Sequence, residues 1–241
     1  MAIPCGQGSE AKPENDPMTR KNKSYKAMLF DLDGTLLDSK KDIAQATNAT
    51  LAHMGCAFLT EETIYTYVGH GVRDLIRGAL GKGPREREDA ALAYFNTYYL
   101  AHCTDHSRLF KGGEALLGEL QLRGIQLAIL TNKPKGFTDQ IVSALNLSKH
   151  FGFVVSAEGG YPNKPDKMGA QAILEHFKVS PNDALMVGDS VVDLQTAENT
   201  DMDCALMLNG FSPREEILAL KSRATYIFEE LGELLVLAKG C

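Results

Sequence analysis

The sequence has no apolar segment long enough to cross a membrane, no segment with the pattern of a signal peptide at its start, and no excess of positive charge. No run approaches the about 18 apolar residues that a membrane-spanning helix requires. The first 24 residues lack the apolar centre of a signal peptide, and their acidic side chains are not typical of an organelle transit peptide. The net charge of −6 gives no indication of non-specific nucleic-acid binding. We therefore expect neither a membrane nor a nucleic acid as a partner.

The sequence also has few cysteines, and none of them forms a CxxC pair. The five cysteines are scattered over 241 residues, which is typical of reduced thiols in an intracellular protein. We therefore expect a cytoplasmic location. Hydrophobic residues make up 44% of the chain, which is enough for a sizeable core. Residues 1–24 are polar, and we expect them to form a disordered N-terminal extension.

Two aspartates, Asp31 and Asp33, follow directly on the apolar segment 27–30. If that segment is a strand, their side chains point to the same side and crowd together where the strand ends. Two like charges this close are costly unless a cation binds there or one carboxylate carries a proton. Gly34 allows a sharp exit from the strand, and Thr35 offers a hydroxyl. A hairpin turn at this point is disfavoured, because helical periodicity follows.

Helix and strand patterns divide the chain into an α/β core and a helical insert. Residues 40–105 show helical periodicity and predict a small helical cap. The rest, residues 25–39 and 106–241, alternates between strand and helix and predicts a Rossmann-like parallel sheet with helices on both faces. After the first strand, strands are predicted at 126–130, 153–156, 184–187, 203–207 and 225–228, and helices at 114–123, 136–145, 167–177, 191–199, 213–220 and 231–238.

Polar side chains follow several of the predicted strands, at the edge where ligands bind in such sheets. Thr131 and Asn132 follow one strand, Asp189 follows another, and Asp193 comes four residues later. Lys164 precedes a predicted helix. Each residue alone has a structural explanation, as a helix cap, a charge in a first helical turn or a solvated loop lysine. Together, at the ends of neighbouring strands, they indicate a binding site.

The chain resembles the haloacid dehalogenase-like hydrolase superfamily in four motifs, over residues 26 to about 230. The motifs are Asp31-Leu32-Asp33-Gly34-Thr35, Thr131-Asn132, Lys164-Pro165 and Gly188-Asp189-Ser190-Val191-Val192-Asp193. The helical insert resembles the superfamily's C1 cap. Three segments are similar to phosphoglycolate phosphatases in particular: Asp38-Ser39, Val68-Gly69-His70-Gly71 and Thr131-Asn132-Lys133-Pro134. The third motif departs from the usual pattern, because Lys167 stands where a proline often follows.

The resemblance implies a Mg²⁺-dependent phosphatase that forms an aspartyl-phosphate. By that resemblance, Asp31 is the nucleophile and a metal ligand. Asp33 is the general acid/base, and its backbone carbonyl binds the metal. Asp189 is a metal ligand, and Asp193 is an accessory ligand or supports the others. Mg²⁺ suits such a set, because it is a hard cation that prefers oxygen ligands.

The resemblance also implies how the substrate is held. Thr131, Asn132 and Lys164 would bind the phosphate, and Lys164 would offset its repulsion from the nucleophile. In the cap, Arg73 could bind a substrate carboxylate, although an exposed helix arginine is an equally open interpretation. Lys133 is a less favoured contact, because the side chains of adjacent residues often point apart.

The resemblance favours a small phosphorylated metabolite as substrate, with hydrolysis of 2-phosphoglycolate to glycolate and phosphate as the leading hypothesis. A sugar phosphate, a nucleotide or pyrophosphate are alternative substrates, and a phosphomutase of the same fold is an alternative enzyme. A phospho-acceptor regulatory module is the non-enzyme alternative, although it would need neither Asp33 nor a long cap. Both a monomer and a homodimer are compatible with the sequence.

Overall fold

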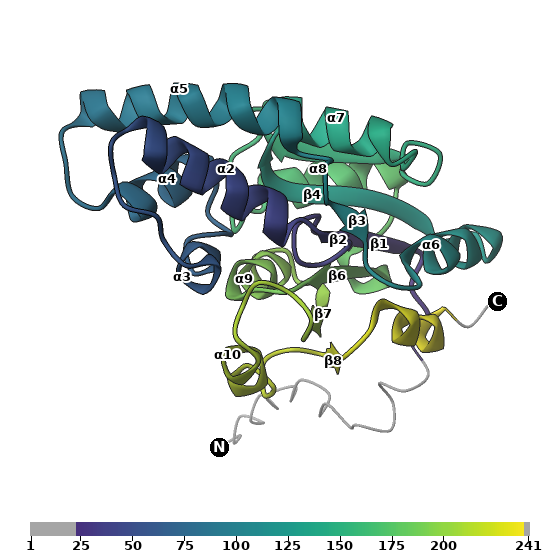
Figure 1. Ribbon diagram of the computed structural model, residues 1–241. Coiled ribbons are helices and arrows are strands. Elements are labelled where there is room, and N and C mark those ends of the chain that lie inside the picture. The colour runs from purple at the N-terminus through teal and green to yellow at the C-terminus, as the bar shows by residue number, and fades with distance from the viewer. Residues whose placement is uncertain (1–22, 239–241) are drawn as a thin grey trace, which may run out of the picture.

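A parallel six-stranded sheet forms the centre of the molecule in the computed structural model, which describes residues 23–238 (Figure 1). The strand order is β5-β4-β1-β6-β7-β8, and every neighbouring pair is parallel. The strands are β1 (Ala27–Phe30), β4 (Gln126–Pro134), β5 (Phe153–Ala157), β6 (Ala184–Gly188), β7 (Asp203–Met207) and β8 (Tyr226–Phe228). Because β1 lies between β4 and β6, the residues that follow these three strands meet at one edge of the sheet.

The central strand is apolar without interruption because both of its faces are covered. All four residues of β1 are fully buried. Met28 and Phe30 belong to one apolar cluster, and Ala27 and Leu29 belong to another on the opposite face. Burying a large side chain such as Phe30 stabilises the fold by about 1.5–3 kcal/mol. This buried centre holds the functional edge of the sheet in place.

Helices cover both faces of the sheet. On one face lie α6 (Gly113–Leu122), α7 (Lys135–Ala144) and the 3₁₀ helix η2 (Leu231–Leu237). On the other lie α8 (Met168–Phe177), α9 (Val191–Asn199) and α10 (Arg214–Ala219), with the short 3₁₀ helix η1 (Pro181–Asp183) before β6. The predicted Rossmann-like α/β fold is therefore confirmed.

A block of four helices is inserted between β1 and β4 and lies to one side of the sheet (Figure 1). The helices are α2 (Lys40–His53), α3 (Glu61–Tyr65), α4 (Val72–Leu80) and α5 (Arg85–His102). In Figure 1, the C-terminal end of α5 meets α7 of the core, and the rings of Tyr99 and Phe137 join the two helices with their centroids 4.9 Å apart. The predicted helical cap is thus present. Its proposed limits, residues 40–105, remain a prediction.

Two short strands that the sequence pattern did not predict carry the chain between core and cap. β2 (Leu37–Asp38) pairs antiparallel with β3 (Arg108–Leu109). Strands of two residues are too short to show a period, so no pattern reveals them. The buried carboxylate of Asp42 on α2 joins the same region, because it accepts hydrogen bonds from the backbone N–H groups of His106 and Ser107.

The other differences from the sequence-based prediction are small. β4 continues past residue 130 to Pro134, where it still pairs with β5 after a register shift. The segment predicted as a helix at 231–238 is a 3₁₀ helix over residues 231–237. The predicted extension, residues 1–24, lies outside the described residues except for its last two. Within residues 23–238, no helix is both long and apolar enough to cross a membrane.

Candidate active site

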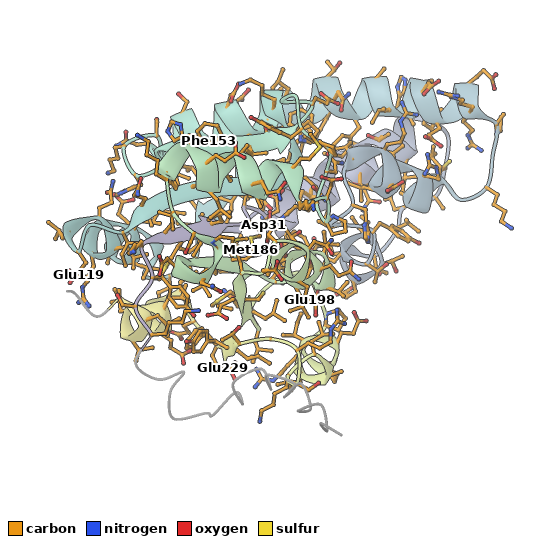
Figure 2. The ribbon with its side chains drawn as sticks, turned by 180° about the vertical axis from the view of Figure 1, so that it is seen from behind. Asp31, Glu119, Phe153, Met186, Glu198 and Glu229 are labelled. Carbon is orange, nitrogen blue, oxygen red and sulfur yellow. The ribbon has the colours of Figure 1, made fainter. Side chains whose placement is uncertain are left out.

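Asp31 lies directly after β1, near the centre of the molecule, where the sheet meets the cap (Figure 2). Its backbone N–H still donates to Val187 of β6 at 2.9 Å, so the sheet fixes its position. One carboxylate oxygen lies 2.8 Å from Nζ of Lys164, and the side chain is 13% exposed. Asp31 is therefore held rigidly and remains accessible from the cavity that it lines.

The glycine after the aspartate pair lets the carboxylate of Asp189 approach. Gly34 has a φ of +82°, and a Cβ atom there would lie 2.4 Å from a carboxylate oxygen of Asp189. That carboxylate accepts hydrogen bonds from the Thr35 hydroxyl at 3.1 Å and from the backbone N–H of Phe211 at 2.6 Å. The Gly-Thr part of the first motif thus positions Asp189 from the side of β1.

Three carboxylates meet at this edge of the sheet. Asp31, Asp189 and Asp193 each place one oxygen within 4.8 Å of the others. Burial, followed by the charges of Asp193 and Asp31, raises the pKa of Asp189 to about 8. Burial also raises the pKa of Asp31 to about 6, and Lys164 limits that rise. A buried acidic cluster of this kind favours either protons or a cation, and its oxygen donors fit Mg²⁺.

Asp193 is fully buried and supports its neighbours from the first turn of α9. One carboxylate oxygen accepts a hydrogen bond from Nζ of Lys164 at 2.6 Å. The other accepts from the backbone N–H of Asp189 and from the Ser190 hydroxyl, which forms a capping box with Asp193. The missing side chain of Gly188 leaves the room for Asp193, because a Cβ atom on residue 188 would lie 2.1 Å from the Asp193 carboxyl carbon.

Lys164 joins two of the carboxylates. Its Nζ lies 2.8 Å from Asp31 and 2.6 Å from Asp193, and its side chain is 3% exposed. Burial alone would lower the pKa of Lys164, but the carboxylates of Asp193 and Asp31 raise it above its usual value. The interpretation of Lys164 as a solvated loop lysine therefore does not fit this structure.

Thr131 and Asn132 both line the cavity, but they have different surroundings. The Thr131 hydroxyl oxygen accepts a hydrogen bond from the backbone N–H of Lys133 at 3.2 Å, so its own hydrogen can still be donated. The Asn132 amide accepts from the backbone N–H of Lys164 at 2.7 Å and donates to the backbone carbonyls of Lys164 and Gly69, both at 3.0 Å. Its side chain thus connects the Lys164 loop to the cap, and its proposed contact with phosphate remains a prediction.

Lys133, which the sequence disfavoured as a contact, also lines the cavity. Its Nζ lies 2.8 and 2.9 Å from the two carboxylate oxygens of Asp33 and donates to the Tyr99 hydroxyl of the cap at 2.7 Å. The Ser39 hydroxyl donates to the same Asp33 carboxylate at 2.6 Å. The register shift between residues 130 and 134 breaks the strict alternation of β4, so three consecutive residues, Thr131, Asn132 and Lys133, line one cavity.

The cap supplies an apolar wall to the cavity, whose volume is about 70 Å³. Its apolar lining consists of Ile43, Val68, Val72, Leu75, Phe95 and, from the core, Phe137 and Phe211. Arg73 is not part of this lining. Its guanidinium is 44% exposed and lies 2.8 Å from both Glu88 and Asp89 on α5. The structure thus brings together all the predicted site residues except Arg73.

The family of the chain follows from comparison with known proteins. The profile of the haloacid dehalogenase-like hydrolase family matches residues 28–207. The chain belongs to this family. It is 35% identical over 219 residues to a phosphoglycolate phosphatase of Rhodospirillum rubrum, covering 87% of this chain and 90% of the relative. It is 32% identical over 200 residues to a phosphoglycolate phosphatase of Nitrosospira multiformis, covering 81% and 88%. The predicted family and the prediction of a hydrolase are therefore confirmed.

Solved structures support the same fold. A crystal structure of a phosphoglycolate phosphatase assigned by prediction, from Haemophilus somnus, superposes with a TM-score of 0.82 at 24% identity, covering 89% of this chain and 98% of that one. A second, from Lactobacillus delbrueckii, has a TM-score of 0.81 at 27% identity and covers 90% and 98%. The arrangement of sheet and cap is thus shared along almost the whole length of these structures.

Proposed function

We propose that the protein is a Mg²⁺-dependent phosphatase that hydrolyses a small phosphate monoester, 2-phosphoglycolate, through an aspartyl-phosphate. The observation that carries this proposal is the position of Asp31, whose accessible carboxylate lies between a buried lysine and two further buried carboxylates. Such a site can accept a phosphate only if cations offset the acidic charge, and Lys164 together with a divalent ion does so.

In the proposed reaction, a carboxylate oxygen of Asp31 attacks phosphorus and the bond to the leaving oxygen breaks. Asp33 gives its proton to that oxygen, and glycolate leaves. A water molecule then gives a proton back to Asp33 and attacks the phosphorus of the aspartyl-phosphate. This second step releases phosphate and restores the Asp31 carboxylate. The two aspartates therefore divide the nucleophilic and proton-transfer roles between them.

The other residues hold the phosphate and the ion. Lys164 offsets the repulsion between Asp31 and the phosphate, and Thr131 supplies its hydroxyl as a hydrogen-bond donor. Both amide hydrogens of Asn132 bond to backbone carbonyls, so Asn132 would donate to the phosphate through its backbone N–H. Mg²⁺ would be held by the Asp31 carboxylate, the Asp33 backbone carbonyl and Asp189, with Asp193 in an accessory position. When bound, it neutralises charge on the phosphoryl oxygens.

Two observations support a small substrate. The relatives with 32–35% identity are named phosphoglycolate phosphatases. The cap side chains Val72, Leu75 and Phe95 in the cavity lining are apolar and supply no hydrogen-bond partner for the base and ribose of a nucleotide.

A homodimer or a monomer would serve this reaction equally well, and the cytoplasmic location remains a prediction.

The test is a substrate panel on the purified full chain. We expect phosphate release from 2-phosphoglycolate to exceed release from sugar phosphates, nucleotides and pyrophosphate, to stop when EDTA removes the ion, and to return on addition of Mg²⁺. Asp31→Asn should abolish turnover, whereas Asp139→Asn, at an exposed position on α7, should not. No phosphate release from any substrate would exclude a phosphatase. Transfer of phosphate within a sugar phosphate, without release, would indicate a phosphomutase.

A further inference from the structure

We propose that Lys133 and Tyr99 form a subsite for a carboxylate on the leaving group of the substrate, so that they, and not Arg73, determine specificity for an acidic phosphate ester. The inference rests on the proposed phosphatase function. It assigns the part of the cavity that would bind the carboxylate of the substrate, which is its second negative group beside the phosphate.

Cations are scarce in the cavity. Among the residues that the structure describes, only Lys133 and Lys164 bring a positive charge to its lining. Lys164 already lies between Asp31 and Asp193, at the end where the phosphate would bind. Arg73 and Arg77 lie on α4 close in sequence to Val72 and Leu75, which line the cavity. Both arginines pair with Glu88, which lies outside the lining. A second negative charge on the substrate would therefore have to meet Lys133.

The cap side of the cavity makes such a partner necessary. Apart from Tyr99, the side chains that α4 and α5 contribute to the lining are apolar, namely those of Val72, Leu75 and Phe95. A carboxylate that is enclosed by such side chains loses its hydration and requires a compensating charge or hydrogen bond. The Lys133 ammonium and the Tyr99 hydroxyl are polar groups of the same lining and bond to each other.

The position of the leaving group places its carboxylate beside Lys133. In the proposed reaction Asp33 gives a proton to the leaving oxygen, so that oxygen lies against the Asp33 carboxylate. Nζ of Lys133 is 2.8 Å from one oxygen of that carboxylate. In 2-phosphoglycolate a single methylene separates the leaving oxygen from the carboxylate, so the substrate carboxylate falls within reach of the same ammonium group.

Tyr99 holds the lysine and adds a donor of its own. The Tyr99 hydroxyl accepts a hydrogen bond from Nζ at 2.7 Å, which leaves its hydrogen for an oxygen of the substrate. Nζ also lies 4.7 Å from the centre of the Tyr99 ring. The ring is 1% exposed and stacks on Phe95 with a centroid distance of 5.3 Å. Tyr99 of the cap therefore positions Lys133 of the core, and the two side chains together would bind the substrate carboxylate.

The experiment compares two substrates that differ only in that carboxylate. We would measure kcat/KM for 2-phosphoglycolate and for ethyl phosphate, whose leaving group is of similar length but uncharged, with the full chain and Mg²⁺. Lys133→Met leaves Asp33 without its ammonium partner and slows both reactions. The decisive quantity is the kcat/KM for 2-phosphoglycolate divided by the kcat/KM for ethyl phosphate. Loss of a carboxylate contact lowers this ratio, whereas an equal slowing of both reactions leaves it unchanged.

We expect Lys133→Met to lower that ratio by about 10- to 100-fold, the size of a hydrogen bond to a charged group. Tyr99→Phe removes one neutral donor and should lower the ratio by about 3- to 10-fold. Lys135→Met, two residues away at an exposed position on α7, is the matched control and should leave the ratio unchanged. Circular dichroism of each variant checks that it is folded.

The outcomes separate this inference from the proposed function. If wild-type protein hydrolyses neither ester, 2-phosphoglycolate is not its substrate and the proposed function is wrong on that point. If it hydrolyses both equally well, or if Lys133→Met slows both by the same factor, the phosphatase proposal survives and the carboxylate subsite does not. In the latter case Lys133 only positions Asp33. A lowered ratio in Lys133→Met together with a normal ratio in Arg73→Gln would support the subsite.

Discussion

The core edge and the cap of this protein place their charges in opposite ways. At the core edge, carboxylates and ammonium groups are inside: Lys164 and Asp193 are 3% and 0% exposed. In the cap, the arginines of α4 are outside: Arg73 and Arg77 are 44% and 55% exposed, and apolar side chains line the cavity. Buried ions depend on one another far more than exposed ions do. We therefore expect the chemistry to reside in the core and the cap to act mainly through shape.

The largest expected effect that tests this comparison is at Lys164. Lys164→Met leaves Asp31 and Asp193 as buried carboxylates without their shared cation, and the phosphate loses a positive charge. We expect kcat/KM for 2-phosphoglycolate to fall by at least about 100-fold, as for loss of a group that stabilises the transition state. Steady-state kinetics would measure the effect, and Lys167→Met, at an exposed position three residues away, is the control. Activity within a few fold of wild type would contradict the proposed role.

A smaller effect is expected from crowding the same cluster without removing a charge. Gly188→Ala would place a Cβ atom 2.1 Å from the Asp193 carboxyl carbon, so the Asp193 side chain must shift within the cluster that it forms with Lys164. Overpacking of this kind costs about 1–3 kcal/mol of unfolding free energy. We expect a loss of stability in urea denaturation together with reduced kcat. Gly118→Ala on α6, where a Cβ atom would meet nothing within 4 Å, should cause neither. Wild-type stability of Gly188→Ala would show that the cluster adapts easily.

The junction between core and cap should contribute to stability and not to chemistry. Asp42 on α2 is 1% exposed and accepts hydrogen bonds from the Ser107 hydroxyl and from the backbone N–H groups of His106 and Ser107. Although burial opposes it, these hydrogen bonds lower the pKa of Asp42 below its usual value of 3.8. The stabilisation is therefore complete at pH values above the unfolded-state pKa and is lost as the pH falls through the folded-state pKa.

We accordingly expect Asp42→Asn to lower the unfolding free energy by about 2 kcal/mol at pH 7, the size of hydrogen bonds to a charged group. The difference from wild type should shrink below the usual pKa of an aspartate, because protonation then weakens the same bonds in the wild type. Urea denaturation of both proteins at neutral and acidic pH measures this difference, with Asp139→Asn as the exposed control. A difference that stays constant with pH would show that the charge of Asp42 is not what the junction uses.

The sequence predicted the elements and the edge of the sheet well, because both depend on local patterns. An apolar strand followed by a polar motif can be identified from consecutive residues, and this holds for Asp31 and Asp189. Lys133 was not predicted, because its direction depends on a register shift in β4 that is set by pairing with a different strand. The surroundings of Asn132 were not predictable either, because its partners at Lys164 and Gly69 come from other parts of the chain.

Arg73 offers the smallest expected effect and the clearest contrast with Lys133. From the sequence alone, a substrate contact and an exposed helix arginine were both open, because the direction of an α4 side chain depends on how α4 packs against α5. The structure gives the guanidinium two carboxylate partners, Glu88 and Asp89, at 2.8 Å each. Hydrogen bonds to Asp89 and Glu88 raise the pKa of Arg73, so its charge is already compensated on the outer surface of the cap.

We therefore expect Arg73→Gln to leave KM and kcat for 2-phosphoglycolate near their wild-type values and to change thermal stability only slightly, because exposed ion pairs contribute little. Arg77→Gln, which removes a neighbouring pair with Glu88, is the matched control and should behave in the same way. A selective rise in KM for 2-phosphoglycolate in Arg73→Gln, with ethyl phosphate unaffected, would mean that the cap rearranges to bring Arg73 to the carboxylate. In that case the cap would act through charge, and the contrast between an ionic core edge and an apolar cap would fail at the residue that defines it.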